Sequence, residues 1–445
     1  MEVAYKMYAE RIDNVRTVKH FGKVTQVIGL VIEAAGPAVS IGRLCQIENY
    51  DNGARVKAEV VGFRDDRILL MPLGPITGIS PGAIVTSTFE QLRLPVGNEL
   101  IGRILGGMGQ PLDDQGPITT SATRPLNADP IKPLHRERIL EPIRTGIRVI
   151  DLTCSVGQGQ RMGIFSGSGV GKSVTLGMIA RGSSADVNVV ALVGERGREV
   201  REFIERDLGP EGMRNTVVVA VTSDEPPLIR IKGALLATTI AEYFRDQGNN
   251  VMLMMDSLTR IAMAQREIGI AVGEPPTTKG YTPSVFALLP RLLERAGKSA
   301  KGSITGLYTV LVEGDDFNEP ISDAVRSILD GHVSLSRRLA SLNQYPAVDV
   351  LGSISRLMKD ISPEEENDLA AETREILATY REAEDLINIG AYAAGTNPRI
   401  DRAIAKKQQL DELFRQGIFE LAEHSESVSR LGSILSDVAA TEAPA

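Results

Sequence analysis

The sequence predicts an α/β protein with a small N-terminal β-barrel, a central domain containing a mostly parallel sheet, and a C-terminal helical domain. Residues 22–95 carry short apolar runs between Gly, Pro and Asp turns, a pattern typical of a barrel. Over 96–358, continuous apolar runs alternate with amphipathic patterns, so we expect helices on both faces of the sheet. Over 359–445, apolar residues recur at three and four positions, as in helices.

The barrel prediction depends on three apolar runs: Val24–Ile32, Arg55–Gly62 and Arg67–Met71. Ahead of them, the segment 1–21 alternates apolar and charged residues, which is compatible with a short helix and equally with a frayed terminus. A Gly/Pro-rich connection from Gly97 to Pro133 is expected to lead from the barrel into the central domain.

The most specific motif is the glycine-rich stretch Ser166-Gly-Ser-Gly-Val-Gly-Lys-Ser173. Its glycines permit backbone angles that point successive N–H groups at phosphate oxygens, while Lys172 adds a cation and Ser173 a hydroxyl for Mg²⁺. An apolar strand, Met162–Phe165, precedes the motif and a helix follows, which a flexible linker would not show. The sequence therefore predicts a phosphate-binding loop (P-loop) for a nucleoside triphosphate. The predicted nucleotide contacts are Ser166, Gly167, Ser168, Gly169, Val170, Gly171, Lys172 and Ser173, with Ser166 at the place where the strict pattern has Gly.

Two further apolar runs end in carboxylates. Val251–Met255 leads into Asp256, which is expected to hold Mg²⁺ through water at the carboxyl edge of the sheet. Val189–Val193 opens into Glu195, our candidate for the general base that orients and polarises the attacking water. Arg196 is expected to orient that carboxylate or the phosphate.

The charged residues after Glu195 have a simpler interpretation. Their spacing indicates an exposed helix face with local charge pairing rather than a site, and it involves Arg198, Glu199, Arg201 and Glu202. We do not extend that interpretation to Glu195, because it stands directly at the end of a buried strand.

Composition restricts the partners. The net charge is −8 with a pI of about 5.4, and aromatic residues make up 4% with no Trp, so a nucleic-acid partner is not expected. No apolar run approaches the ~18 residues that would span a bilayer, and no signal-peptide core is apparent, so a cytoplasmic protein is expected. Cysteines and histidines lack metal-site spacing and are interpreted as structural: Cys45, Cys154, His20, His135, His332 and His424.

A set of motifs in order carries a family resemblance across most of the chain. The chain resembles the flagellum-specific export ATPases, whose relatives are the type III secretion ATPases of injectisomes and, more distantly, the catalytic subunits of rotary ATP synthases. The motifs, besides the P-loop, are Gly194-Glu-Arg-Gly-Arg-Glu-Val200, Met255-Asp-Ser-Leu-Thr-Arg260, Gly273-Glu-Pro-Pro-Thr-Thr-Lys-Gly-Tyr281, Tyr308-Thr-Val-Leu-Val-Glu-Gly-Asp-Asp316, Leu329-Asp-Gly-His-Val-Ser-Leu-Ser-Arg-Arg-Leu339, Tyr345-Pro-Ala-Val-Asp349 and Ser353-Ile-Ser-Arg356.

The resemblance implies a RecA-like P-loop core that uses ATP and Mg²⁺. Lys172 and Ser173 would bind phosphate and metal, Glu195 would activate water, and Asp256 would be the second metal-side carboxylate. Arg356 would reach into the neighbouring subunit's nucleotide site, so that activity requires assembly; read from the sequence alone, it is a surface arginine at a helix end. Tyr345 would stack on adenine, whereas a tyrosine before proline is more often a loop residue packed on the core.

The function implied is ATP hydrolysis by a hexameric ring that energises export of flagellar proteins through a type III secretion apparatus, with chaperone release and substrate unfolding. Implied partners are regulatory and stalk subunits, membrane proteins of the export gate, and chaperone–substrate complexes, with the ATPase peripheral to the inner membrane. The alternatives are an injectisome ATPase, a rotary catalytic subunit and a non-catalytic ring subunit. A rotary role is disfavoured because the C-terminal domain lacks an acidic lever and carries Lys406 and Lys407 instead. A scaffold role is disfavoured because Glu195 is present.

Overall fold

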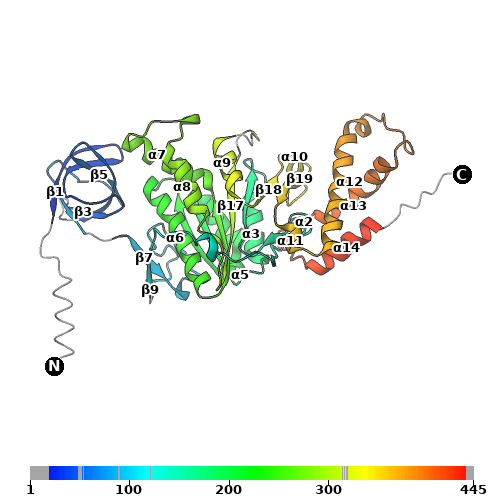
Figure 1. The fold of residues 1–445 in the computed structure, drawn as a ribbon, viewed down its shortest axis with the longest axis horizontal. Helices are drawn as coiled ribbons and strands as arrows, with labels where there is room; N and C mark the ends of the chain where they lie inside the picture. The colour runs from blue at the N-terminus through cyan, green and yellow to red at the C-terminus, as the bar shows by residue number, and fades with distance from the viewer. Residues whose placement is uncertain are drawn as a thin grey trace, which may run out of the picture.

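The computed structural model describes residues 20–48, 53, 55–88, 91–120, 122–312, 314, 316 and 319–436. The molecule is elongated, with the barrel at one end, the sheet in the middle and a group of helices at the other end (Figure 1). This arrangement confirms the predicted fold class. The helix considered for 1–21 lies outside the described residues, except for its last two positions.

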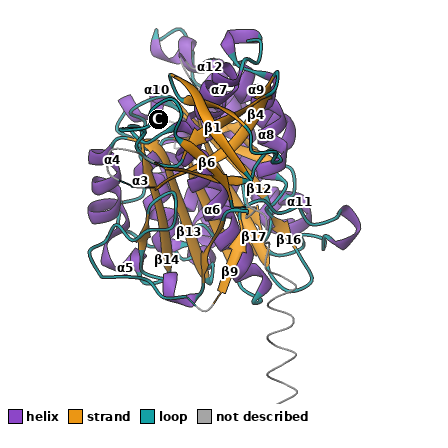
Figure 2. Ribbon diagram, turned by 90° about the vertical axis from the view of Figure 1, so that its left-hand side faces the viewer, coloured by secondary structure: helices purple, strands orange, loops and turns teal. Residues whose placement is uncertain are grey.

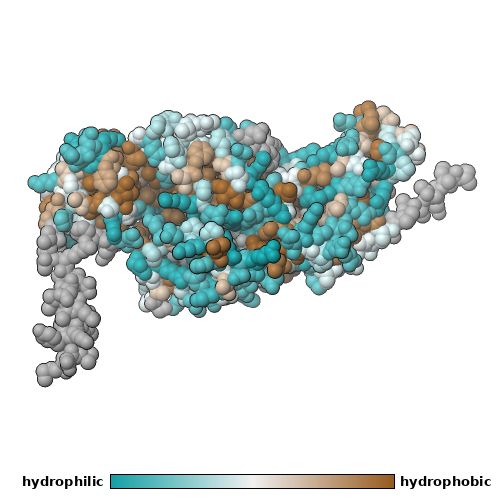
Figure 3. Space-filling view, viewed as in Figure 1, coloured by the Kyte–Doolittle hydropathy of each residue, from teal (hydrophilic) through white to brown (hydrophobic). Residues whose placement is uncertain are grey.

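The barrel is a closed antiparallel sheet in the order β1-β2-β5-β4-β3-β6. Its strands are β1 (Phe21–Ile28), β2 (Val31–Ala35), β3 (Leu44–Glu48), β4 (Arg55–Arg64), β5 (Arg67–Pro72) and β6 (Ile84–Ser87). Reading Val24–Ile32 as one run was wrong, because it contains a hairpin: Gly29 turns the chain with φ of 55°. Apolar side chains gather on the outside of the barrel (Figure 3), among them Phe21, Ile28 and Phe63.

The barrel is docked on two helices of the central domain, α6 (Pro227–Asp246) and α7 (Leu258–Val272). Inside the contact, Lys232 Nζ lies 2.7 Å from Glu59 Oε2, and the two side chains are only 5% and 10% exposed. The apolar side chains buried in this contact are Val31, Leu69, Met71, Leu228, Ile231, Ala264 and Ile268. Because this ion pair is largely shielded from water, losing one partner would leave a buried charge and weaken the docking of the barrel.

The central sheet has the strand order β19-β18-β12-β17-β15-β13-β14-β8 and is parallel except for the β18–β19 pair. A short strand, β16 (Gly297–Lys298), adds antiparallel to β17. The other strands are β8 (Ile104–Leu105), β12 (Arg161–Ser166), β13 (Val187–Glu195), β14 (Thr216–Thr222), β15 (Asn250–Asp256), β17 (Ser303–Leu311), β18 (Gly331–Leu335) and β19 (Val348–Ser355). The segment Gly97–Pro133 is more than the connection that we predicted, since it supplies β8 to the sheet edge and β9 (Ala122–Pro125), which pairs with β7 (Arg93–Val96).

Helices cover both faces of this sheet (Figure 2). Because side chains alternate along a strand, β13 sends Val189, Ala191 and Val193 into one apolar core and Val190 and Leu192 into the other. The remaining elements of the central domain are β10 (Pro142–Ile143), β11 (Val156–Gly157), α2 (Arg148–Thr153), α3 (Lys172–Gly182), α4 (Gly197–Glu202), a π-helix (Phe203–Leu208), α5 (Gly209–Met213), α8 (Pro283–Leu293), α9 (Pro320–Ile328), α10 (Arg337–Ser341), α11 (Met358–Ile361) and three short 3₁₀ turns (Asn98–Leu100, Pro133–His135 and Thr278–Gly280).

The C-terminal helices are α12 (Glu364–Asn388), α13 (Pro398–Phe414) and α14 (His424–Ser436). The first turn of α12 is acidic, which suits the positive end of a helix dipole. Across the described chain, the helices are each too short or too polar to pass through a bilayer.

Candidate active site

The P-loop joins β12 to α3 at the carboxyl edge of the sheet. Gly169 and Gly171 take the left-handed conformation, with φ of 80° and 90°. A Cβ at Gly171 would lie 3.4 Å from the Tyr345 ring, so that position is restricted both by its backbone and by its neighbour. α3 begins directly at Lys172, which puts the helix N-terminus at the loop.

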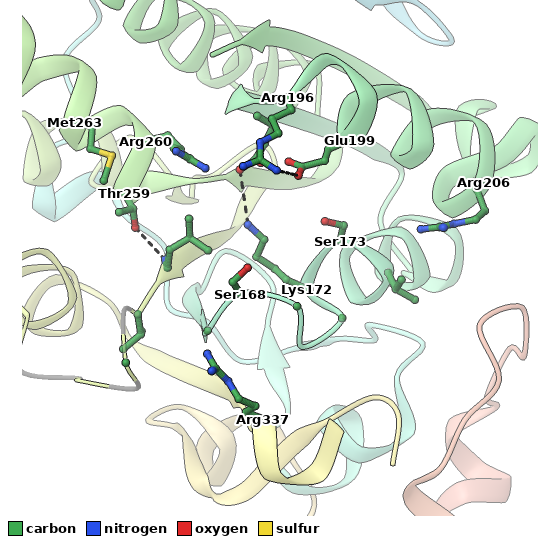
Figure 4. A pocket seen from close by; sticks show the side chains of 18 residues that line it. Ser168, Lys172, Ser173, Arg196, Glu199, Arg206, Thr259, Arg260, Met263 and Arg337 are labelled. Atoms are coloured by element: carbon green, nitrogen blue, oxygen red, sulfur yellow. Dashed lines mark hydrogen bonds and ion pairs between the residues drawn. The ribbon is translucent and has the colours of Figure 1, made fainter. Parts of the chain in front are cut away.

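The loop opens into a cavity of about 600 Å³, large enough for a nucleotide. Side chains from α4, α7 and α10 converge on the loop (Figure 4). The cavity is lined by Gly167, Ser168, Gly169, Gly171, Lys172, Ser173, Val174, Glu195, Arg196, Glu199, Arg206, Thr259, Arg260, Met263, Leu311, Val312, Gly314 and Arg337. Of the loop residues predicted to bind nucleotide, Ser166 and Val170 are buried behind this lining, each 2% exposed.

Lys172 is held between two strand-end carboxylates. Its Nζ lies 2.5 Å from Asp256 Oδ1 and 3.8 Å from Glu195 Oε1. Thr309, on the strand between β12 and β15, donates a second hydrogen bond of 2.7 Å to Asp256 Oδ1. The Asp256 side chain is buried, with 2% exposure. The contacts of Lys172 bring together three residues that the sequence predicted, Lys172 itself, Glu195 and Asp256.

Glu195 stands at the end of β13 with its side chain 12% exposed. Burial and the negative charge of Asp256 raise the pKa of Glu195 to about 7, and the ammonium of Lys172 opposes that rise. A hydrogen bond with the carboxylate of Glu199 raises the pKa of Glu195 further and lowers that of Glu199. A group with such a pKa exchanges protons readily near neutral pH, as a general base must.

The interpretation of Glu199 as part of an exposed helix face with local charge pairing is confirmed, since its side chain is 45% exposed and lies 3.6 Å from Arg196. The sequence did not reveal that Glu199 also lines the cavity. Glu199 lies one turn after Glu195, on the side of α4 that faces the cavity. The same interpretation is confirmed for Arg198 and Arg201, which form exposed i,i+4 pairs with Glu202 and Glu205 at 2.8 and 2.7 Å.

Arg196 and Arg260 place two guanidinium groups at the cavity. Arg196 is 78% exposed and lies 3.6 Å from Glu199 Oε1. Arg260 comes from the first turn of α7, and its stem packs so closely on Gly194 that a Cβ there would lie 2.9 Å from Arg260 Cβ. We had given Arg260 no role. The spacing of Thr259, Arg260 and Met263 after Asp256 is the signal that could have revealed a helix face turned to the site.

The last two predicted site residues, Tyr345 and Arg356, lie outside the lining of the cavity. Tyr345 is beside the loop, 39% exposed, with its ring against Gly171. Arg356 is exposed and outside the cavity of its own chain. It follows β19, whose last residue, Ser355, pairs with Gly331 at the start of β18, while the P-loop emerges beside the end of β18. The two ends of β18 thus separate Arg356 from the nucleotide site of the same chain.

Comparison with known families matches each part of the chain. Residues 146–355 match the nucleotide-binding domain of the ATP synthase alpha/beta family, and residues 24–88 match the β-barrel domain of that family. Residues 362–433 match the T3SS EscN ATPase C-terminal domain. The fold and the P-loop therefore define an ATPase of the ATP synthase alpha/beta class.

Individual relatives narrow this class. The chain is 56% identical over 426 residues to the "Flagellum-specific ATP synthase" of Bacillus subtilis (strain 168), covering 95% of this chain and 97% of that protein. It is 48% identical over 419 residues to the "Type 3 secretion system ATPase" of Xanthomonas euvesicatoria, covering 94% and 95%. The structure of the assembled ATPase EscN in complex with its central stalk EscO, from the type III secretion system of enteropathogenic E. coli, matches with a TM-score of 0.86 at 42% identity, covering 93% of this chain and 100% of that chain. The chain belongs to the family of flagellum-specific and type III secretion ATPases, and it is an ATP-hydrolysing enzyme.

Proposed function

We propose that this chain hydrolyses MgATP as one subunit of a hexameric ring and so energises export of flagellar proteins through a type III secretion apparatus, including chaperone release and substrate unfolding. The observation that carries the proposal is the contact of the P-loop Lys172 with two strand-end carboxylates, one of which has a pKa near neutrality. We favour the flagellar over the injectisome assignment because identity to the flagellar relative of Bacillus subtilis is 56%. Other flagellar relatives, at 44–49%, are about as similar to this chain as secretion ATPases, at 46–48%.

The residues divide the chemistry as follows. Backbone N–H groups of residues 167–171 and the ammonium of Lys172 hold the phosphates, and Glu195 accepts the proton of the attacking water. Arg260 and Arg196 supply positive charge where the transferred phosphoryl group builds up negative charge. In-line attack then needs no covalent step on the protein.

The donor set at the loop fits Mg²⁺. Ser173 offers a hydroxyl and Asp256 a carboxylate, both hard oxygen ligands. Within the described residues, no three His, Cys, Asp or Glu side chains gather as they would for an all-protein metal cage. That composition suits a cation which takes its other ligands from phosphate and water, and which neutralises phosphate charge when bound.

Hydrolysis is expected to decline as the pH falls through about 7, because Glu195 must be ionised to accept a proton and its pKa is raised to about 7. Burial and Asp256 raise this pKa most, and the hydrogen bond with Glu199 adds to the rise. The change Glu199→Gln removes that added part, so the acid limb of kcat/KM should move somewhat to lower pH while the rest of the rise remains. Steady-state rates across the neutral range measure this, with Arg198→Ala as the exposed neighbouring control. An acid limb that stays in place in Glu199→Gln would contradict the link between the two carboxyl groups.

The ring itself is tested by specific activity against protein concentration, with light scattering recorded on the same samples. If Arg356 completes the neighbour's site, activity rises as rings form, and Arg356→Ala keeps nucleotide binding but loses the assembly-dependent rate, about 100-fold. Arg399→Ala serves as an exposed arginine control on α13. Full activity of Arg356→Ala in assembled rings would contradict the proposed role of Arg356. A chain that binds ATP but does not hydrolyse it at any protein concentration would instead favour a non-catalytic ring subunit.

The remaining partners follow from this function. By analogy with the complex of EscN with its central stalk EscO, we propose a stalk subunit for the ring of this chain. Regulatory subunits, export-gate membrane proteins and chaperone–substrate complexes complete the proposed set, with the enzyme in the cytoplasm and peripheral to the inner membrane.

A further inference from the structure

Residues 336–346, which we call the bridging segment, contact both the P-loop and the C-terminal helices. The segment comprises α10 and the turn before β19. It leaves β18 at Leu335, which pairs with Ser166, the last residue before the P-loop glycines. Its course therefore begins beside the nucleotide cavity and ends on the sheet edge that faces α12 and α13.

Two side chains of the bridging segment face the nucleotide site. Arg337 lines the cavity, and its guanidinium points at the part of the P-loop that carries Ser168 (Figure 4). At the other end of the segment, the Tyr345 ring lies against Gly171. A guanidinium in a cavity built for phosphates offers planar, permanently charged donors to phosphate oxygens.

Three groups of the same segment hold the C-terminal helices. Arg338 Nη1 donates to both carboxylate oxygens of Glu384 on α12, at 2.9 and 3.2 Å. Gln344 Nε2 donates to Asp411 on α13 at 3.3 Å. The Tyr345 carbonyl accepts a hydrogen bond of 2.9 Å from the backbone N–H of Gln416, just beyond α13.

We propose that Arg337 is a further nucleotide-binding residue and that the Arg338–Glu384 ion pair sets its position, so that nucleotide affinity depends on the docking of the C-terminal helices. The two arginines are consecutive in a helix of five residues, so the ion pair that anchors Arg338 to α12 also anchors the backbone that carries Arg337 beside the P-loop. By reciprocity, a nucleotide that engages Arg337 strengthens the docking of α12. The inference rests on the proposed nucleotide site.

The expected loss of nucleotide affinity follows from how exposed the ion-paired side chains are to water. The Arg338 side chain is 51% exposed and that of Glu384 is 29%, so the pair is partly screened by water. Loss of such a pair changes an equilibrium by about threefold. Loss of a direct charged contact to phosphate, as in Arg337→Ala, costs about tenfold or more in affinity.

The test is titration calorimetry of ADP with the full chain at a concentration where it is monomeric. Arg338→Ala and Glu384→Ala should each weaken ADP binding about threefold, and the double variant should be no weaker than either alone. The charge-reversed pair, Arg338→Glu with Glu384→Arg, should restore affinity, which would assign the effect to the ion pair rather than to either side chain alone. The matched control is Arg399→Ala, which removes an exposed ion pair of 2.6 Å to Glu375 within the C-terminal helices and should leave ADP affinity unchanged.

Two results would overturn the inference. The first is an ADP affinity of Arg338→Ala and Glu384→Ala that is unchanged, or reduced no more than that of Arg399→Ala. The second is an unchanged ADP affinity of Arg337→Ala. The variant Lys172→Ala distinguishes an error in the proposed coupling from an error in the proposed nucleotide site. If Lys172→Ala loses ADP while the bridging variants keep it, only the coupling is wrong, and if Lys172→Ala binds normally, the nucleotide site is wrong.

Discussion

Replacing Lys172 with Ala is expected to abolish nucleotide binding. The ammonium lies at the start of α3, within the loop whose glycines turn the backbone toward the cavity, and it is the cation that this loop brings to the phosphates. The Lys172 side chain is only 12% exposed, so loss of this charged donor should weaken ATP affinity about 100-fold or more. Equilibrium binding of ATP at low protein concentration measures this directly.

The same substitution also affects folding, because Asp256 loses its nearest cation and is itself buried. Removing one partner of a buried pair costs about 3 kcal/mol of the free energy of unfolding. Combining Lys172→Ala with Asp256→Asn removes both charges, so this double variant should recover its melting temperature without recovering ATP binding. Lys301→Ala is an exposed lysine control. ATP binding by a well-folded Lys172→Ala chain would refute the assignment of the P-loop.

Changing Glu195 to Gln is expected to leave ATP bound and to lower turnover about 1,000-fold. The amide has nearly the shape of the carboxyl group and still donates to Glu199, so the cavity keeps its form, but it cannot accept a proton from water. Single-turnover hydrolysis, measured with enzyme in excess over ATP and at a concentration that binds all of the ATP, separates the chemical step from binding.

Two outcomes decide the role of Glu195. Retention of more than about a tenth of the rate would exclude this residue as the general base, since a positioned base contributes far more. Loss of binding together with turnover would mean that the carboxylate shapes the site instead. Glu202→Gln, in the exposed pair one turn further along, is the matched control and should behave as the parent.

The parts of the fold and of the site that could be predicted are each marked by a pattern within a short stretch of sequence. The P-loop, Glu195 and Asp256 each follow an apolar strand, and parallel strands deliver their ends to one edge whatever the order of the strands. The two-residue strand β8 has no periodicity to detect, and the hairpin at Gly29 lies inside an unbroken apolar run. Both therefore escaped prediction.

The positions of the residues that were missed depend on where a helix begins and on which strands are neighbours in the sheet. Glu199 faces the cavity only because α4 begins at Gly197, a detail that charge spacing does not reveal. Arg337 reaches the P-loop because β18 lies beside β12, although the two strands are far apart in sequence. A single sequence carries no information on that pairing, whereas the capture of Lys172 between two carboxylates needs only the strand ends.

The docking of the barrel has a mechanical consequence. The helix α7 places Arg260 at the cavity on its first turn and buries Ile268 against the barrel about two turns later, so a rod of about 12 Å joins the two places. Because sliding the barrel on its support would separate the buried Lys232–Glu59 pair at a cost in free energy, a load applied to the barrel is expected to pass through the contact. A force that tilts the barrel is therefore expected to act along that rod on Arg260, whose side chain lines the cavity at the P-loop.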